Sequence, residues 1–131
     1  MNEPMVKALS VRQPWAWAIV AGLKPVENRT WRTVYRGPLA IHASQRFDAD
    51  GAAWIAQHVG CAVPAALPHG GIVGHVQLTD CVEQFDSPWF FGPYGFVLQR
   101  ATALPLVPLP GRLRLFDVAA TVLTPATVEA T

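Results

Sequence analysis

Residues 22–31 read GLKPVENRTW and place Lys24, Glu27 and Arg29 within six residues of one another, followed by Trp31. If residues 26–31 are extended, side chains alternate between two faces, so Glu27, Arg29 and Trp31 share one face. A solvated loop or a simple ion pair requires neither the lysine nor the tryptophan. A nucleotide pocket can use all four side chains, because cations hold phosphate, an indole stacks a base and a carboxylate accepts hydrogen bonds. The alternative is a catalytic cluster, in which Lys24 and Glu27 divide acid and base roles.

The residues on either side of this stretch predict a small mixed α+β fold. A short helix is expected at 14–23, beginning at Pro14 and ending at Gly22, and a second helix at 48–60, capped by Asp48 or Asp50. Alternating or β-rich runs predict strands at 6–13, 26–33, 38–44, 72–83, 95–106 and 112–119. Most of these strands follow one another at turns. This order favours a β-barrel of five or six strands, with two or three short helices across its openings, over alternating βαβ units.

Composition indicates one folded, soluble domain. The chain has 131 residues, of which 51% are hydrophobic and only 15% charged, which argues against disorder. No segment approaches the ~18 apolar residues of a membrane span, and the N-terminus lacks the order of a secretory signal, so a cytoplasmic location is expected. Cys61 and Cys81, with His69 and His75 between them, contain no CxxC or HxxxH pair. We therefore expect inert thiols and no metal site.

Basic residues are concentrated in one part of a chain whose net charge is only +1. Seven of them and a single acid lie between residues 7 and 46, whereas residues 47–99 contain five acids and no Lys or Arg. Such a distribution can present a positive face to nucleic acid, although arginines on a sheet can equally serve only to solvate it. The candidate nucleic-acid-binding residues are Lys24, Arg29, Trp31, Arg12, Trp17, Arg32 and Arg46.

The spacing of Gly22, Lys24, Glu27 and Arg29 resembles the GxKxxExR signature of the ASCH domain family, which is related to the PUA RNA-binding fold. The segments 9-LSVRQPWAWAIVAG-22, 39-LAIHAS-44 and 94-YGFVLQRATAL-104 also resemble family segments. The resemblance covers 6–118, which leaves 119–131 as a flexible C-terminal tail. It implies a PUA-like barrel with a cleft beside the motif, and RNA or a nucleotide-like small molecule as the ligand.

The resemblance also raises enzymatic alternatives. Some small family members resemble amidohydrolases that deacylate N4-acetylcytidine, and others are thought to cleave single-stranded RNA. In the amidohydrolases a threonine stands three residues after the lysine, whereas this chain has Glu27 there, and a carboxylate does not replace a hydroxyl nucleophile. Ser44 and Thr30 carry hydroxyls, and His42 shares a face with Ser44 if residues 38–44 form a strand. Nothing in the sequence places these side chains beside Lys24, so they are weaker catalytic candidates than Lys24 and Glu27.

The sequence therefore predicts an RNA- or nucleotide-binding protein, with a ribonuclease or nucleoside amidohydrolase as alternatives. No cofactor is expected, apart from a divalent metal in the case of a nuclease. A protein-interaction module is a further alternative, and the aromatic loop around Trp89 would then make the contact.

Overall fold

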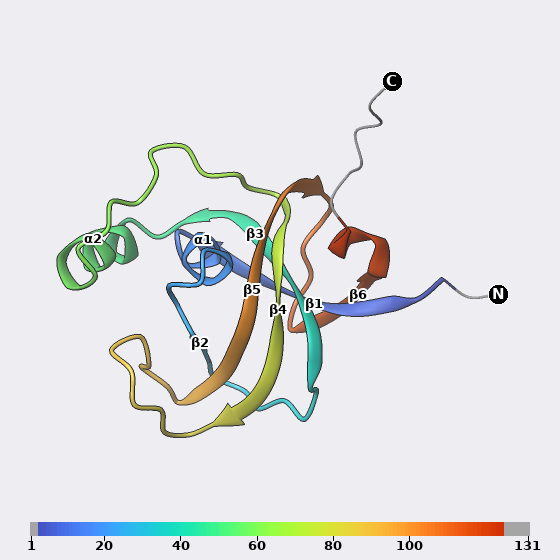
Figure 1. The fold of residues 1–131 in the computed structure, drawn as a ribbon, viewed down its shortest axis with the longest axis horizontal. Coiled ribbons are helices and arrows are strands. Elements are labelled where there is room, and N and C mark those ends of the chain that lie inside the picture. Colours follow the sequence, from blue (N-terminus) through green and yellow to red (C-terminus); the bar gives the residue numbers. More distant parts are fainter. Residues whose placement is uncertain (1–2, 125–131) are drawn as a thin grey trace.

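The computed structural model describes residues 3–124 and contains one six-stranded mixed sheet (Figure 1). Its strands lie in the order β2-β5-β4-β3-β1-β6, and all neighbours are antiparallel except the parallel pair β1 and β3. The strands are β1 (Met5–Gln13), β2 (Val26–Arg29), β3 (Gly37–Phe47), β4 (Gly71–Val82), β5 (Tyr94–Pro108) and β6 (Leu115–Ala119). The helices are α1 (Trp15–Val20), α2 (Ala49–His58) and the single 3₁₀ turn η1 (Ala120–Leu123). The α+β class and the six strands are confirmed.

The sheet is not closed as a barrel, and this corrects the expected architecture. β2 and β6 are its two edge strands, and they do not pair with each other. β6 covers β1 only from Met5 to Leu9, so the rest of β1 has an open edge. β2 has only four residues and is too short to complete a ladder. Alternating hydrophobicity identifies strands, but closure depends on strand number, tilt and register, which the pattern does not contain.

One face of the curved sheet packs around α1, which explains why this helix is apolar all round. Ala16, Ile19 and Val20 join the main core, while Ala18 packs on the other side with Val26 and Trp89. The helix is therefore covered from more than one direction, as its composition predicts. The main core also contains buried side chains from four strands, β1, β3, β4 and β5, namely Leu9, Val11, Leu39, Ile41, Ala43, Val73, Val76, Leu78, Phe96 and Leu98.

The opposite face of the sheet holds a smaller core, formed around Ala8, Ala40, Ile72 and Phe116. Ala120, Val122 and Leu123 of η1 pack against it. The segment expected to be a flexible tail, 119–131, thus begins at the end of β6 and continues into a packed turn. The remaining residues of that expected tail, 125–131, lie outside the described residues.

A third cluster joins α2 to the aromatic loop between β4 and β5. Trp89 is only 6% exposed and meets Trp54 of α2 with ring centroids 5.1 Å apart. Asp48 caps α2 by accepting from the Gly51 N–H at 2.9 Å, as one of the two sequence alternatives proposed. Within residues 3–124, none of the helices has the length and apolarity to cross a bilayer.

Candidate functional site

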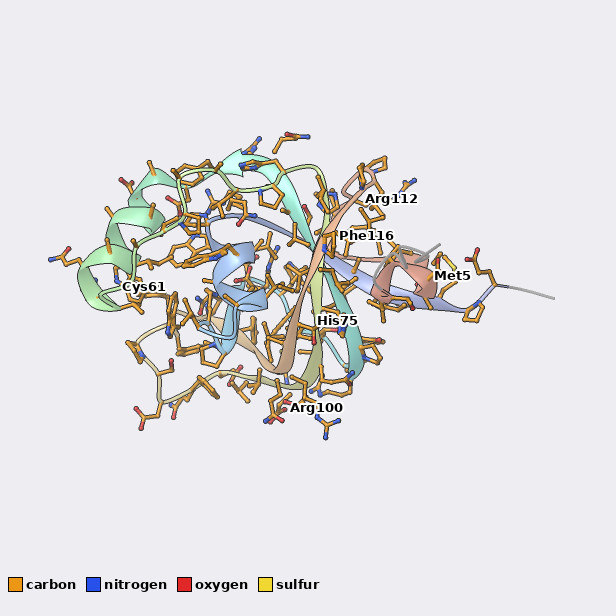
Figure 2. All side chains as sticks on the ribbon, turned by 45° about the horizontal axis from the view of Figure 1, so that its top comes forward. Met5, Cys61, His75, Arg100, Arg112 and Phe116 are labelled. Atoms are coloured by element: carbon orange, nitrogen blue, oxygen red, sulfur yellow. The ribbon has the colours of Figure 1, made fainter. Side chains whose placement is uncertain are left out.

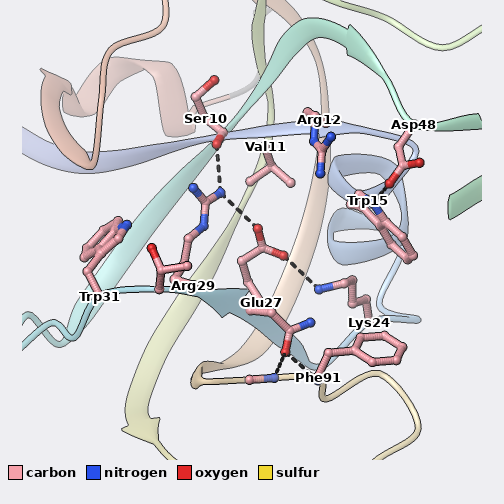
Figure 3. A pocket seen from close by; sticks show the side chains of 13 residues that line it. Ser10, Val11, Arg12, Trp15, Lys24, Glu27, Arg29, Trp31, Asp48 and Phe91 are labelled. Carbon is pink, nitrogen blue, oxygen red and sulfur yellow. Dashed lines mark hydrogen bonds and ion pairs between the residues drawn. The ribbon is translucent and has the colours of Figure 1, made fainter. Parts of the chain in front are cut away.

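Lys24, Glu27 and Arg29 form one buried charge cluster at the start of β2 (Figure 3). Lys24 Nζ donates to Glu27 Oε1 at 2.8 Å, and Arg29 Nη2 donates to Glu27 Oε2 at 2.9 Å. Lys24 and Glu27 are 4% and 7% exposed, so water screens this cluster poorly. Because β2 is extended, Glu27 and Arg29 share a face, as the alternation predicts.

The Glu27 carboxylate is stabilised in its charged form. Burial by itself raises the pKa of Glu27, but the charges and hydrogen bonds of Lys24 and Arg29 outweigh burial and hold the pKa below its ordinary value. Both carboxylate oxygens are already engaged by cations. A general base works best when its pKa lies near the operating pH, so this environment makes Glu27 a poor base and a strong organiser of the two cations.

Arg29 also spans the gap between β2 and the open edge of β1. Its Nη2 donates to the Ser10 carbonyl oxygen at 2.9 Å, although the two strands are not paired in the sheet. Its Nε is buried and has no hydrogen-bond partner within the described residues 3–124. A buried donor without an acceptor is costly, so the Arg29 guanidinium holds one hydrogen-bonding group that the described residues do not satisfy.

A cleft of about 470 Å³ lies at this gap, lined on one side by β1 and on the other by β2. Trp31 forms part of its wall and is held by the Phe96 ring at 5.1 Å and by the Arg114 guanidinium, 5.0 Å from the ring centroid. The lining residues are Ser10, Val11, Arg12, Trp15, Lys24, Glu27, Asn28, Arg29, Thr30, Trp31, Asp48, Phe91 and Gly92. The walls therefore combine cations, indoles and hydrogen-bonding groups.

Asn28 fixes the aromatic lip of the cleft. Its side-chain oxygen accepts from the backbone N–H groups of Phe91 and Gly92, at 2.8 and 3.0 Å, and its amide nitrogen donates to the Trp89 carbonyl at 3.0 Å. Phe91 remains 64% exposed while lining the cleft, and its ring lies 5.6 Å from that of Trp54. The loop thus presents an accessible aromatic ring beside the charge cluster.

The other predicted binding residues are divided between the cleft and its surroundings. Arg12 lines the cleft together with Lys24, Arg29 and Trp31. Arg32 is exposed outside the lining, with its guanidinium 5.8 Å from the Tyr94 ring centroid. Arg46 is exposed at the end of β3, away from the lining, and Trp17 packs against the cluster that joins α1 and α2.

The weaker catalytic candidates, Ser44 and His42, line a different hollow from Lys24, whereas Thr30 lines the cleft. His42 Nε2 lies 2.8 Å from the Leu109 carbonyl, which can only accept, so this nitrogen carries the hydrogen. His42 Nδ1 lies 3.1 Å from Ser10 Oγ. Both ring nitrogens therefore have structural partners: Nε2 holds the loop after β5, and Nδ1 faces the neighbouring strand β1.

Sequence reasoning missed Ser10, Asn28, Phe91 and Arg114. The alternation assigned Asn28 to the face away from the charges, and it does turn toward the loop, where it builds the cleft through the backbone of Phe91. Arg114 comes from a distant segment and carries no local signal that would connect it to Trp31. Among residues 3–124, no three His, Cys, Asp or Glu side chains gather as metal ligands, and both cysteines are free.

Residues 9–100 match the ASCH domain family, a segment that includes β1, α1, the charge cluster and most of the sheet. The chain belongs to the ASCH domain family. It is 35% identical over 83 residues to human activating signal cointegrator 1, a match that covers 58% of this chain, and 34% identical to the mouse protein over the same length. The matched region spans only 14% of each cointegrator.

A solved structure of the same family shares the fold. This ASCH protein is similar to a mutant ZmASCH protein from Zymomonas mobilis, with a TM-score of 0.51 and 19% sequence identity. The similarity covers 79% of this chain and 75% of the Zymomonas chain. At that identity, the likeness establishes the arrangement of elements and leaves ligand and activity to the site itself.

Proposed function

We propose that this ASCH protein binds RNA or a nucleotide-like ligand in the cleft between β1 and β2. The observation that carries the proposal is the cluster in which Glu27 holds Lys24 and Arg29 side by side within a cleft that also contains Trp31 and Phe91. Two cations held by one carboxylate leave a net positive charge facing the ligand. Phosphate oxygens would accept from the cations, and a base would stack on the accessible aromatic rings.

The same arrangement favours binding over chemistry at Glu27. A carboxylate whose two oxygens are both taken up by cations has its pKa lowered, so it has little tendency to remove a proton from a hydroxyl group. The structure also places His42 and Ser44 in the neighbouring hollow and not beside Lys24. Ribonuclease and amidohydrolase activity therefore remain secondary to recognition in this proposal.

The test compares Arg29→Gln with the matched control Arg36→Gln. Arg36 is an exposed arginine that pairs with Asp80 at 3.5 Å and does not line the cleft. Fluorescence anisotropy with single-stranded RNA should show wild-type affinity that falls with salt. Loss of charge-assisted hydrogen bonds worth about 1.5–3 kcal/mol should weaken binding by Arg29→Gln roughly ten-fold or more, while Arg36→Gln stays near wild type.

Parallel assays offer single-stranded RNA, with and without divalent metal, and N4-acetylcytidine to the wild-type protein, Lys24→Ala and Glu27→Ala. We expect no turnover. Product that forms with the wild type and disappears in both variants would replace the binding proposal with an enzymatic one. Binding that is insensitive to salt and to Arg29→Gln would refute the cleft as a nucleic-acid site.

A further inference from the structure

A second hollow, of about 590 Å³, lies on the other side of β1 from the cleft. The binding site proposed above does not include it. Arg112 is its cation, and Ser44 and Gln45 supply polar groups. None of the residues that line it is acidic; they are Ser10, His42, Ser44, Gln45, Gly70, Leu109, Pro110, Gly111, Arg112 and Leu113. A hollow with one cation, several neutral polar groups and no carboxylate suits an anionic group.

The loop that carries Arg112 is fixed to the sheet. His42 donates from Nε2 to the Leu109 carbonyl at 2.8 Å, and the Leu109 N–H donates to the Gly70 carbonyl at 3.2 Å. Gly111 approaches so closely that an added Cβ would lie 2.8 Å from His42 Cε1. The Arg112 backbone therefore has a defined position, while its side chain is exposed and free to reach a ligand.

Two contacts connect this hollow to the cleft. Ser10 lines both, because its carbonyl faces Arg29 in the cleft while its hydroxyl lies 3.1 Å from His42 Nδ1 in the hollow. Arg114, two residues after Arg112, places its guanidinium over Trp31, which is a wall of the cleft. Ser10 and the contact between Arg114 and Trp31 therefore join the lining of the cleft to the chain segment that lines the second hollow.

We propose that the second hollow binds a neighbouring phosphate of the same RNA strand whose nucleotide occupies the cleft, with Arg112 as the phosphate contact. This inference rests on the proposed function and makes it more specific: the ligand is a strand with at least two nucleotides, and a free nucleoside fills only half of the site. Leu113, which is 91% exposed at the rim, offers an apolar surface for the base attached to that phosphate.

The experiment measures anisotropy with fluorescein-labelled oligouridylates, from one nucleotide to about six. The variants are Arg112→Gln and the control Arg100→Gln, an exposed arginine on β5 that Figure 2 shows at the opposite side of the molecule from Arg112. Wild-type affinity should increase where the strand becomes long enough to reach both hollows. Arg112→Gln should lower the affinity for longer strands about five-fold and leave the mononucleotide unchanged. Its salt slope for longer strands should fall by about 0.7, the value for one phosphate contact on a single strand.

The outcomes separate this inference from the proposed function. Equal weakening of the mononucleotide and the longer strands by Arg112→Gln would overturn the second subsite, as would an effect no larger than that of Arg100→Gln. If strands bind in an Arg29-dependent way but ignore Arg112, the second subsite fails and the cleft proposal stands. If the wild type binds no strand of any length, both fail together.

Discussion

Replacing Glu27 by Gln tests the charge cluster directly, because it removes one negative charge and little volume. In the wild type, Glu27 faces Lys24 at 2.8 Å and Arg29 at 2.9 Å. In Glu27→Gln, no carboxylate lies between the two cations. The new amide NH₂ is itself a donor, so it faces the donor groups of Lys24 or Arg29 without an acceptor. The ammonium of Lys24, whose side chain is 3% exposed, cannot recover its hydration without opening the cleft.

The expected cost is about 3 kcal/mol of unfolding free energy. Removing one partner of a buried ion pair typically costs about 3–5 kcal/mol, because the remaining charge stays buried without compensation. The lower end applies here, since the Arg29 side chain is 22% exposed and water reaches part of the cluster. A second pair with the same geometry provides the control: Lys7 Nζ lies 2.8 Å from Asp117 Oδ1, but the side chains are 36% and 57% exposed. Asp117→Asn should cost less than about 1 kcal/mol.

Urea denaturation of the wild type, Glu27→Gln and Asp117→Asn, followed by tryptophan fluorescence, gives the three free energies. The unfolding free energy should fall with urea concentration at the same slope in all three proteins, so differences in the midpoint report differences in stability. A Glu27→Gln protein that loses no more than Asp117→Asn would show that burial does not strengthen this cluster, and the reasoning about the cleft electrostatics would be refuted.

The pH dependence provides an independent check of the same group. The pKa of Glu27 is lowered on folding from its ordinary value of 4.5. The unfolded chain therefore takes up a proton before the folded one does, so the stabilisation is fully present above the unfolded pKa and is lost as pH falls through the folded pKa. We expect the difference in unfolding free energy between wild type and Glu27→Gln to be constant near neutral pH and to shrink below about pH 4.5.

Three further substitutions test elements that position the cleft. Asn28→Ala removes three hydrogen bonds to the backbone of the aromatic loop and should cost about 2 kcal/mol in urea denaturation, with faster amide exchange in residues 89–92; an unchanged exchange pattern would contradict this role. Asp48→Ala removes the cap of α2 and the acceptor of the Trp15 indole N–H, and it should lower the unfolding free energy by about 1–2 kcal/mol. The unfolding free energy of Asp48→Asn should lie between those of the wild type and Asp48→Ala, and equal losses in the two variants would argue against capping. Gly74→Ala would place a Cβ 2.3 Å from the Thr102 carbonyl oxygen and should cost about 3 kcal/mol or prevent folding, so a wild-type melting temperature would refute the close approach.

The sequence allowed most elements and the central cluster to be predicted, because these features are local. The strands that the sequence predicts at 6–13 and 72–83 correspond to β1 (Met5–Gln13) and β4 (Gly71–Val82). The shared face of Glu27 and Arg29 follows from the period of a strand, which needs no tertiary information.

Features that depend on contacts between distant segments could not be predicted in the same way. The expected closed barrel is wrong because the edges of β2 and β6 do not meet, and no residue in either strand encodes that separation. His42 and Lys24 are both buried and polar, but β1 lies between their hollows. Arg114 reaches Trp31 only because β6 brings the end of the chain back beside β1. Tertiary packing, and not propensity, decides each of these cases.

Among residues 3–124, one side chain provides the hydrogen bond that joins β1 to β2, from Arg29 to the Ser10 carbonyl. A ladder of backbone hydrogen bonds separates only when a strand is lost, whereas a guanidinium can exchange one acceptor for another by a change of rotamer. If Arg29 Nη2 donates to a phosphate oxygen in place of the Ser10 carbonyl, ligand binding removes this hydrogen bond between β1 and β2. Ligand binding in the cleft and local opening between β1 and β2 would then be coupled through the Arg29 guanidinium. Amide exchange in residues 10–13, along the open edge of β1, would change when the ligand binds.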